Sequence, residues 1–267
     1  MTTKTAVLLR QHVHALQRLT AASPVGRVAR AGSLTYTDSG IDVAAFNAIT
    51  VTGAAWSAGD LDRATGLAAA SGRPWSITAQ RGTGTVRDGA RLRAVEHAAA
   101  CHGLTERDED PFLVCQRADF RPATRSGPAD GPAARIRVDT VSADAWGAYT
   151  ATVAAGFEVP RAAFGSVFGG GLLDDPLVTG YAVRLDDHVV GSGLGVRTDD
   201  GLGVHNIAVL PGERCHGAGR AVTERVVQDG FADGATAAYL VSSVDGLRLY
   251  RSLGFRQVDT LVRWSAA

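Results

Sequence analysis

A stretch rich in proline and glycine near the middle of the chain limits what the chain can fold into. Residues 121–132 hold three prolines and two glycines, and they interrupt both helical and strand periodicity. The 267 residues, 45% of them apolar, are enough to bury a core on each side of this stretch. We therefore predict an N-terminal domain over 1–120, a linker over 121–134 and a C-terminal domain over 135–267.

The segment after the linker predicts a mixed, mostly antiparallel sheet flanked by helices, which is an α/β fold. Alternating apolar residues indicate strands at 135–141, 177–185, 189–197, 204–210, 238–242 and 255–264. Helical periodicity indicates helices at 143–155, from after 219 to about 231, and at 246–253.

The first 120 residues predict α/β order again, although no phosphate loop or catalytic motif stands out. Strands are expected at 33–36, 48–52, 75–80 and 111–116, and helices at 60–70 and 88–101. Asp60 is expected to cap the first of these helices, because a carboxylate can accept hydrogen bonds from free amides there.

Composition argues against several functions. The net charge is zero and the pI is about 7.1, so a broad basic surface for nucleic acid is not expected. The three cysteines form no CxxC pair, so neither a disulfide framework nor a metal site is expected. The first 19 residues are amphipathic and lack the apolar run of a signal peptide or membrane span, which favours a cytoplasmic protein.

Residues 204–220 predict an anion-binding site. A strand ends at Pro211, a turn carries Gly217 and Gly219, and a helix follows. The start of a helix has free N–H groups and the positive end of the macrodipole, and glycine lets a pyrophosphate approach the backbone. Two glycines in a turn are also common in ordinary loops, so a second motif has to support this reading.

Two motifs together resemble the GNAT superfamily of N-acetyltransferases. Arg214-Cys215-His216-Gly217-Ala218-Gly219 resembles its coenzyme A pyrophosphate loop, and Leu249-Tyr250-Arg251-Ser252-Leu253-Gly254-Phe255 resembles its LYxxLGF segment, in the expected order. In the first half, Phe46-Asn47, residues 73–76 and residues 102–106 resemble two-part members, and residues 242–246 resemble a variant seen in actinobacterial members. The resemblance implies two GNAT-like domains in tandem, the first of them degenerate.

The resemblance implies roles for particular residues. Tyr250 would protonate the leaving thiolate, and His205, at the position of a glutamate in many members, would act as base. The alternatives are a buried tyrosine with a satisfied hydroxyl and a packing histidine. Ser243 replaces an asparagine that contacts the cofactor in many members. The residues implied to bind acetyl-CoA or another acyl-CoA are Ile207, Ala208, Val209, Arg214, Cys215, His216, Gly217, Ala218, Gly219, Arg220 and Ser243.

The implied activity is direct transfer of an acetyl group to an amine in a ternary complex. Neutral charge and the extra domain favour a small-molecule amine. Two alternatives stay open, which are a transferase for a protein or peptide amine and a non-catalytic acyl-CoA sensor. Neither the acceptor, the acyl chain length nor the oligomeric state follows from the sequence, since GNAT acceptor pockets are built from variable segments such as 156–173.

Overall fold

The computed structural model describes residues 3–267 except 54, 83, 124–134, 162–163 and 165–170. Most of the predicted linker therefore lies outside the described residues. Contacts divide the chain into two units. The first unit comprises Met1–Leu113, Val241–Asp245 and Gln257–Ala267, and the second comprises Val114–Leu240 and Gly246–Arg256.

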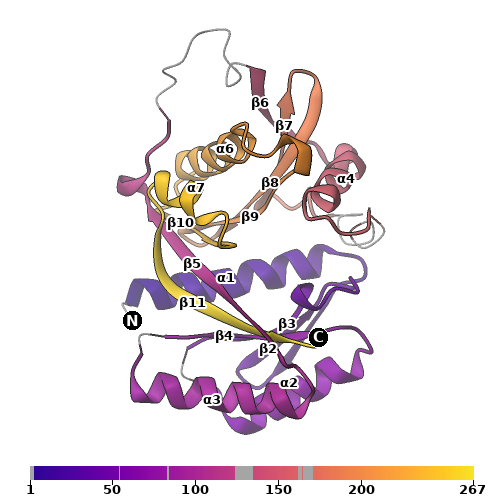
Figure 1. Ribbon diagram of the computed structural model, residues 1–267, viewed down its shortest axis with the longest axis vertical. Coiled ribbons are helices and arrows are strands. Elements are labelled where there is room, and N and C mark those ends of the chain that lie inside the picture. The colour runs from indigo at the N-terminus through magenta and orange to yellow at the C-terminus, as the bar shows by residue number, and fades with distance from the viewer. Residues whose placement is uncertain (1–2, 54, 83, 124–134, 162–163, 165–170) are drawn as a thin grey trace. The chain divides into compact units, whose positions relative to one another are not determined.

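The first unit is a mixed sheet with helices on both faces. Helix α1 (Thr3–Ala22) covers one face, and α2 (Ala58–Ala70) and α3 (Val86–Cys101) cover the other (Figure 1). The strands follow the order β1-β2-β3-β4-β11-β5. Their bounds are β1 Arg27–Ala31, β2 Leu34–Asp38, β3 Asn47–Val51, β4 Ser76–Gln80, β5 Glu106–Gln116 and β11 Arg256–Ser265, and a short turn of 3₁₀-helix, Ala44–Phe46, precedes β3.

The C-terminal strand β11 belongs to the sheet of the first unit, which differs from the predicted boundary of one domain over 135–267. It runs antiparallel to β4, with Leu261 opposite Gln80 and Ser265 opposite Ser76. The physical reason is burial. The apolar face of β11, including Trp264, lies in the core that the first-unit strands share with α2 and α3.

Both helices on that face start with a capping box. Ser57 caps α2 and accepts from the amide of Asp60, whose carboxylate accepts from the amide of Ser57. Thr85 and Asp88 do the same for α3. Asp60 was predicted to be the cap of this helix. The structure corrects this, because Ser57 is the N-cap and Asp60 is the third helical residue, from which it completes the capping box.

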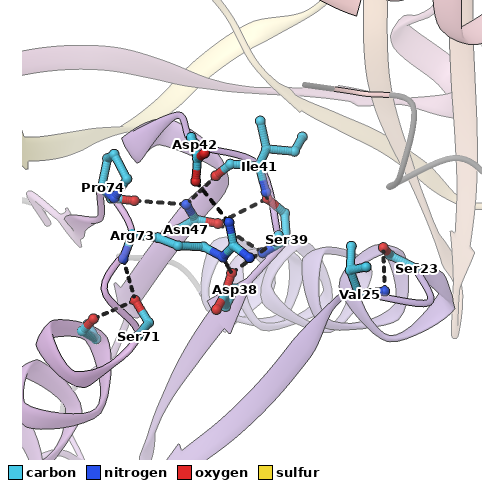
Figure 2. A network of polar contacts seen from close by, with 12 residues as sticks. Ser23, Val25, Asp38, Ser39, Ile41, Asp42, Asn47, Ser71, Arg73 and Pro74 are labelled. Atoms are coloured by element: carbon cyan, nitrogen blue, oxygen red, sulfur yellow. Dashed lines mark hydrogen bonds and ion pairs between the residues drawn. The ribbon is translucent and has the colours of Figure 1, made fainter. Parts of the chain in front are cut away.

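A buried asparagine ties three segments of the first unit together (Figure 2). The Asn47 side-chain oxygen accepts from the amide and the hydroxyl of Ser39, at 2.9 and 3.0 Å. Its nitrogen donates to the carbonyls of Ile41 and Pro74, at 2.6 and 2.8 Å. Asn47 has no exposed surface, so these bonds satisfy an amide that would otherwise be costly to bury. This structural role accounts for one of the residues behind the N-terminal resemblance.

The second unit is a sheet with helices α4 (Trp146–Gly156) and α6 (Ala218–Ala232) on opposite faces (Figure 1). Its strand order is β10-β9-β8-β7-β6, antiparallel except for the parallel pair β9 and β10. The bounds are β6 Ile136–Val141, β7 Val178–Leu185, β8 His188–Thr198, β9 Gly201–Val209, β10 Ala237–Val241 and helix α7 Leu247–Ser252; turns of 3₁₀-helix cover Arg117–Asp119, Ala143–Ala145 and Pro211–Glu213.

Glycine in β8 lets α6 lie close to the sheet. A Cβ at Gly193 would stand 2.6 Å from Val222 of α6. On the opposite face, the Tyr149 hydroxyl of α4 donates to the Gly193 carbonyl at 3.1 Å. The two units together confirm the predicted α/β class with a mixed, mostly antiparallel sheet. No helix in the described residues is long and apolar enough to cross a membrane.

Candidate active site

The start of helix α6 is open to an anion. Gly217 is its N-cap, with φ 94° in the left-handed region, and it offers no side chain to bond the first amides. The first turn also contains no acidic residue. Helices α2 and α3 differ, because Asp60 and Asp88 already stand at their starts. Of these three helix starts, that of α6 is the one that retains free amides and a positive dipole end for a ligand.

Three elements of the second unit meet at this helix start. A Cβ on Gly219 would lie 3.6 Å from Val209 at the end of β9 and 3.7 Å from Leu249 of α7. The Arg220 guanidinium donates to the Ser252 hydroxyl at 2.7 Å, which further connects α6 to α7. The loop motif and the LYxxLGF segment, distant in sequence, are thus neighbours in the structure.

The arginines of the loop are engaged by the protein itself. Arg214 donates to the Gly156 carbonyl at 3.0 Å and pairs with Glu158 at 3.0 Å, which fixes the loop to the end of α4. Arg220 pairs with Glu224 along α6 at 2.9 Å. Both residues therefore shape the loop in this structure. Cys215 and His216 are exposed beside them.

Strands β9 and β10 pair over only part of their length. In the described residues their register covers Gly201–Gly203 with Ala237–Tyr239, although β9 continues to Val209. The next part of β9, which includes the predicted residues Ile207, Ala208 and Val209, lies beyond this parallel ladder. Those amides are the ones expected to face an acyl group.

An irregularity in β9 precedes those amides, and the sequence analysis missed it. Asn206 has φ 51°, and the register between β8 and β9 shifts between Ser192 and Leu194. The Ser192 hydroxyl donates to the Asn206 carbonyl at 3.2 Å. Asparagine tolerates the left-handed region better than most residues, which was the signal available in the sequence. The shift changes the face of the sheet to which the residues after Asn206 point.

Tyr250 lies in α7 with 8% of its surface exposed, and its ring packs edge-on against Phe255 at 5.9 Å. Burial raises the pKa of its hydroxyl to about 12, because the phenolate would lose its hydration. The hydroxyl is therefore protonated at neutral pH. That is the form that a proton donor requires.

His205 precedes the irregularity in β9, and its Nε2 is buried. Its ring covers Gly203, where a Cβ would stand 2.6 Å from Nε2. Desolvation lowers the pKa of the imidazole to about 4, so the ring is neutral at pH 7 and only weakly basic. Neutrality suits a base, whereas the low pKa limits how readily it takes a proton.

Ser243 lies in the turn between β10 and α7, is exposed, and belongs to the short segment that clusters with the first unit. Its carbonyl accepts from the Ser242 hydroxyl at 2.6 Å. Among the residues that the structure describes, no group of three His, Cys, Asp or Glu side chains could hold a metal ion.

Comparison with known sequences identifies the family of this region. Residues 143–255 match the model of the acetyltransferase (GNAT) family. The chain contains a GNAT acetyltransferase domain. This confirms the family and the enzyme class predicted from the two motifs. The GNAT domain includes both the α6 loop and Tyr250. A comparison with curated proteins found no match.

Solved structures extend the GNAT fold over the whole chain. A GCN5-related N-acetyltransferase from Kribbella flavida is 21% identical, with 98% of this chain and 95% of that chain covered, at a TM-score of 0.68. A tandem GNAT protein from the clavulanic acid biosynthesis pathway is 16% identical, with 92% of this chain and 84% of that chain covered, at a TM-score of 0.59. A GCN5-related N-acetyltransferase from Sphaerobacter thermophilus is 18% identical, with 78% of this chain and 64% of that chain covered, at a TM-score of 0.53. The predicted tandem arrangement is confirmed at the level of fold.

Proposed function

We propose that the protein transfers an acetyl group from acetyl-CoA, or another acyl group from its CoA ester, to the amine of a small molecule. The observation that carries this proposal is the open start of α6 at Gly217, directly after β9 and beside α7 within the GNAT domain. Its free amides suit a pyrophosphate, and the residues Arg214 to Arg220 would surround it.

The chemistry proposed for the site is one direct step. The amine nitrogen forms a bond to the thioester carbonyl carbon, and the carbon–sulfur bond breaks. Tyr250, whose hydroxyl is protonated at pH 7, gives that proton to the departing sulfur. Amides of Ile207 to Val209 would stabilise the oxyanion, and His205 would relay the proton that the amine loses.

A small acceptor is favoured over a protein or peptide by the neutral chain, which lacks the acidic excess that would attract a polycation. Residues 162–163 and 165–170 of the segment 156–173, from which such pockets are built, lie outside the described residues. The cytoplasmic location expected from the sequence stays a prediction.

A coenzyme A-release assay against a library of small amines tests the proposal, with acetyl-CoA, propionyl-CoA and longer donors compared in parallel. We expect release above background hydrolysis with at least one amine. Release with basic peptides alone would favour the protein-amine alternative. Tight acyl-CoA binding with no release for any amine would favour the sensor and contradict the proposed enzyme.

A titration by calorimetry tests the location of the proposed cofactor site. We expect one equivalent of acetyl-CoA per chain, because the starts of α2 and α3 are occupied by Asp60 and Asp88. Two equivalents would contradict the proposal that the first unit binds no cofactor.

A further inference from the structure

The first unit contains a cleft that the proposed transfer reaction does not use. Its volume is about 400 Å³, and it lies between helix α1 and the ends of strands β1 to β4. Leu9 and Val13 of α1 supply apolar lining, while Arg10 and His14 of α1 and Arg30 of β1 supply basic groups. In the described part of the chain, no Asp or Glu lines this cleft.

The two arginines of the cleft have no acidic partner in the described part of the chain. Within the described residues, neither Arg10 nor Arg30 takes part in an ion pair, whereas Arg214 and Arg220 in the second unit are both paired with glutamates. Arg10 and Arg30 are also exposed, so a ligand in the cleft could reach both guanidinium groups. A guanidinium binds carboxylate and phosphate oxygens through two parallel hydrogen bonds.

The sequence around the cleft is basic although the chain as a whole is neutral. Residues 1–37 contain five lysines and arginines and no acidic residue, and Asp38 is the first acid. The net charge of the full chain is zero. Two of these five residues, Arg10 and Arg30, line the cleft, and their positive charge raises the local concentration of small anions.

Two carboxylates reach lining residues from behind the walls of the cleft. Asp60 accepts from the Ser33 hydroxyl at 3.1 Å and is paired with Arg63. Asp259 of β11 accepts from the Gln80 amide at 2.7 Å. Each carboxylate accepts further bonds from backbone amides of its own surroundings. These acids thus fix the positions of lining side chains, and the charge facing the cleft stays positive.

We propose that this cleft binds a small molecule that carries a carboxylate or phosphate group. Arg10 and Arg30, from helix α1 and strand β1, bind the anionic group, and Leu9 and Val13 contact the apolar part of the molecule. The volume suits a small metabolite. This site lies in the first unit, so it does not depend on the acyl-CoA site that we propose at α6.

Isothermal titration of the full-length chain in low-salt buffer tests this site, with sodium pyrophosphate and sodium citrate as separate probes. Saturating coenzyme A is present in each titration, because the start of α6 is itself proposed to bind a pyrophosphate. We expect one of the two anions to bind, and the better probe distinguishes a phosphate from a carboxylate ligand. The double variant Arg10→Gln/Arg30→Gln should weaken that binding by at least about tenfold. Both positions are exposed, and thermal unfolding of the variant verifies its fold; each single variant serves if the double variant is unstable.

Two controls separate this site from other effects. Arg27→Gln removes an exposed arginine of the same strand that does not line the cleft, and it should leave anion binding unchanged. Gly217→Val should lose acetyl-CoA binding and keep anion binding. The proposal is wrong if neither anion binds the wild-type chain, if the double variant binds as well as wild type, or if Arg27→Gln weakens binding equally.

Discussion

Burial moves the pKa values of Tyr250 and His205 in opposite directions, because it disfavours the charged form of each side chain. The phenol keeps its proton and the imidazole stays without one at pH 7. The sequence predicted which two residues to consider, from their places in the motifs. It did not predict their ionisation, since that depends on neighbours from several distant elements.

Tyr250→Phe tests the proposed proton donor. The ring and its packing against Phe255 remain, while the hydroxyl proton is lost. We expect turnover to fall by about 10²-fold or more, the usual size of a general-acid contribution, with acetyl-CoA affinity near wild type. Steady-state kinetics and calorimetry measure the two effects. Tyr181→Phe is a matched control, because that buried hydroxyl bonds to Asp229 of α6 and has no proposed part in the reaction. Full turnover of Tyr250→Phe would mean that the thiolate leaves without this residue.

The low pKa of His205 makes a prediction about stability and pH. The unfolded chain takes up the proton near the ordinary value of 6.5, whereas the folded chain takes it up near 4. The contribution of neutral His205 is therefore complete above pH 6.5 and is lost as the pH falls toward 4. His205→Ala should reduce the acid-dependent fall of Tm across this window, and it should lower the overall Tm if the ring is a packing residue.

Activity profiles of the same variant test the proposed proton relay. If His205 accepts the amine proton, His205→Ala should lower the rate near neutral pH and flatten the acidic limb of the profile. A stable variant with an unchanged pH–rate profile would leave His205 as a packing residue only.

At the scale of elements, strand and helix periodicity predicted most of the second unit, because alternation and helical spacing are local properties. The strand β1 was missed, since its residues Arg27–Ala31 carry two arginines and little apolar alternation. The left-handed Asn206 and the shift in β9 were missed as well. Backbone irregularities of this kind arise from pairing between strands, which a single segment does not reveal.

The start of α6 supports a prediction at this scale. Replacing Gly217 or Gly219 by Val should weaken acetyl-CoA binding by well over tenfold, which is more than about 1.4 kcal/mol, because a branched side chain would cover the first amides. At Gly217 the left-handed φ of 94° adds backbone strain. Gly212→Val is the control, since a Cβ there meets no atom within 4 Å. Unchanged affinity by calorimetry in a folded Gly219→Val variant would remove the loop from the proposed cofactor site.

At the scale of the whole molecule, β11 makes the first unit depend on the last residues of the chain. Trp264 has 3% of its surface exposed and lies in the first-unit core, and Gln80 of β4 bonds to Asp259 of β11. A fragment of residues 1–120 therefore lacks an internal strand of its own sheet, the one between β4 and β5, and part of its core. The chain order alone would assign that strand to the other half.

We expect the isolated fragment 1–120 to lack cooperative thermal unfolding, and Trp264→Ala in the full chain to cost about 3–5 kcal/mol, as for other large buried side chains. Near-UV circular dichroism and chemical denaturation measure both. Trp146→Ala is a control of the same chemistry at a position with 37% of its surface exposed, where the cost should be much smaller. A fragment 1–120 that unfolds cooperatively without β11 would show that the strand is dispensable to the first unit.

The sequence by itself determined the α/β class, the order of most elements and the GNAT family, because these rest on local periodicity and on two short motifs. It also determined which residues form the loop at Gly217 and which tyrosine follows it. Only the tertiary structure decided that β11 joins the first unit, that Arg214 is held by Glu158, and that His205 is desolvated. Each of these depends on contacts between residues far apart in the chain, and such contacts leave no periodic signal in either partner segment.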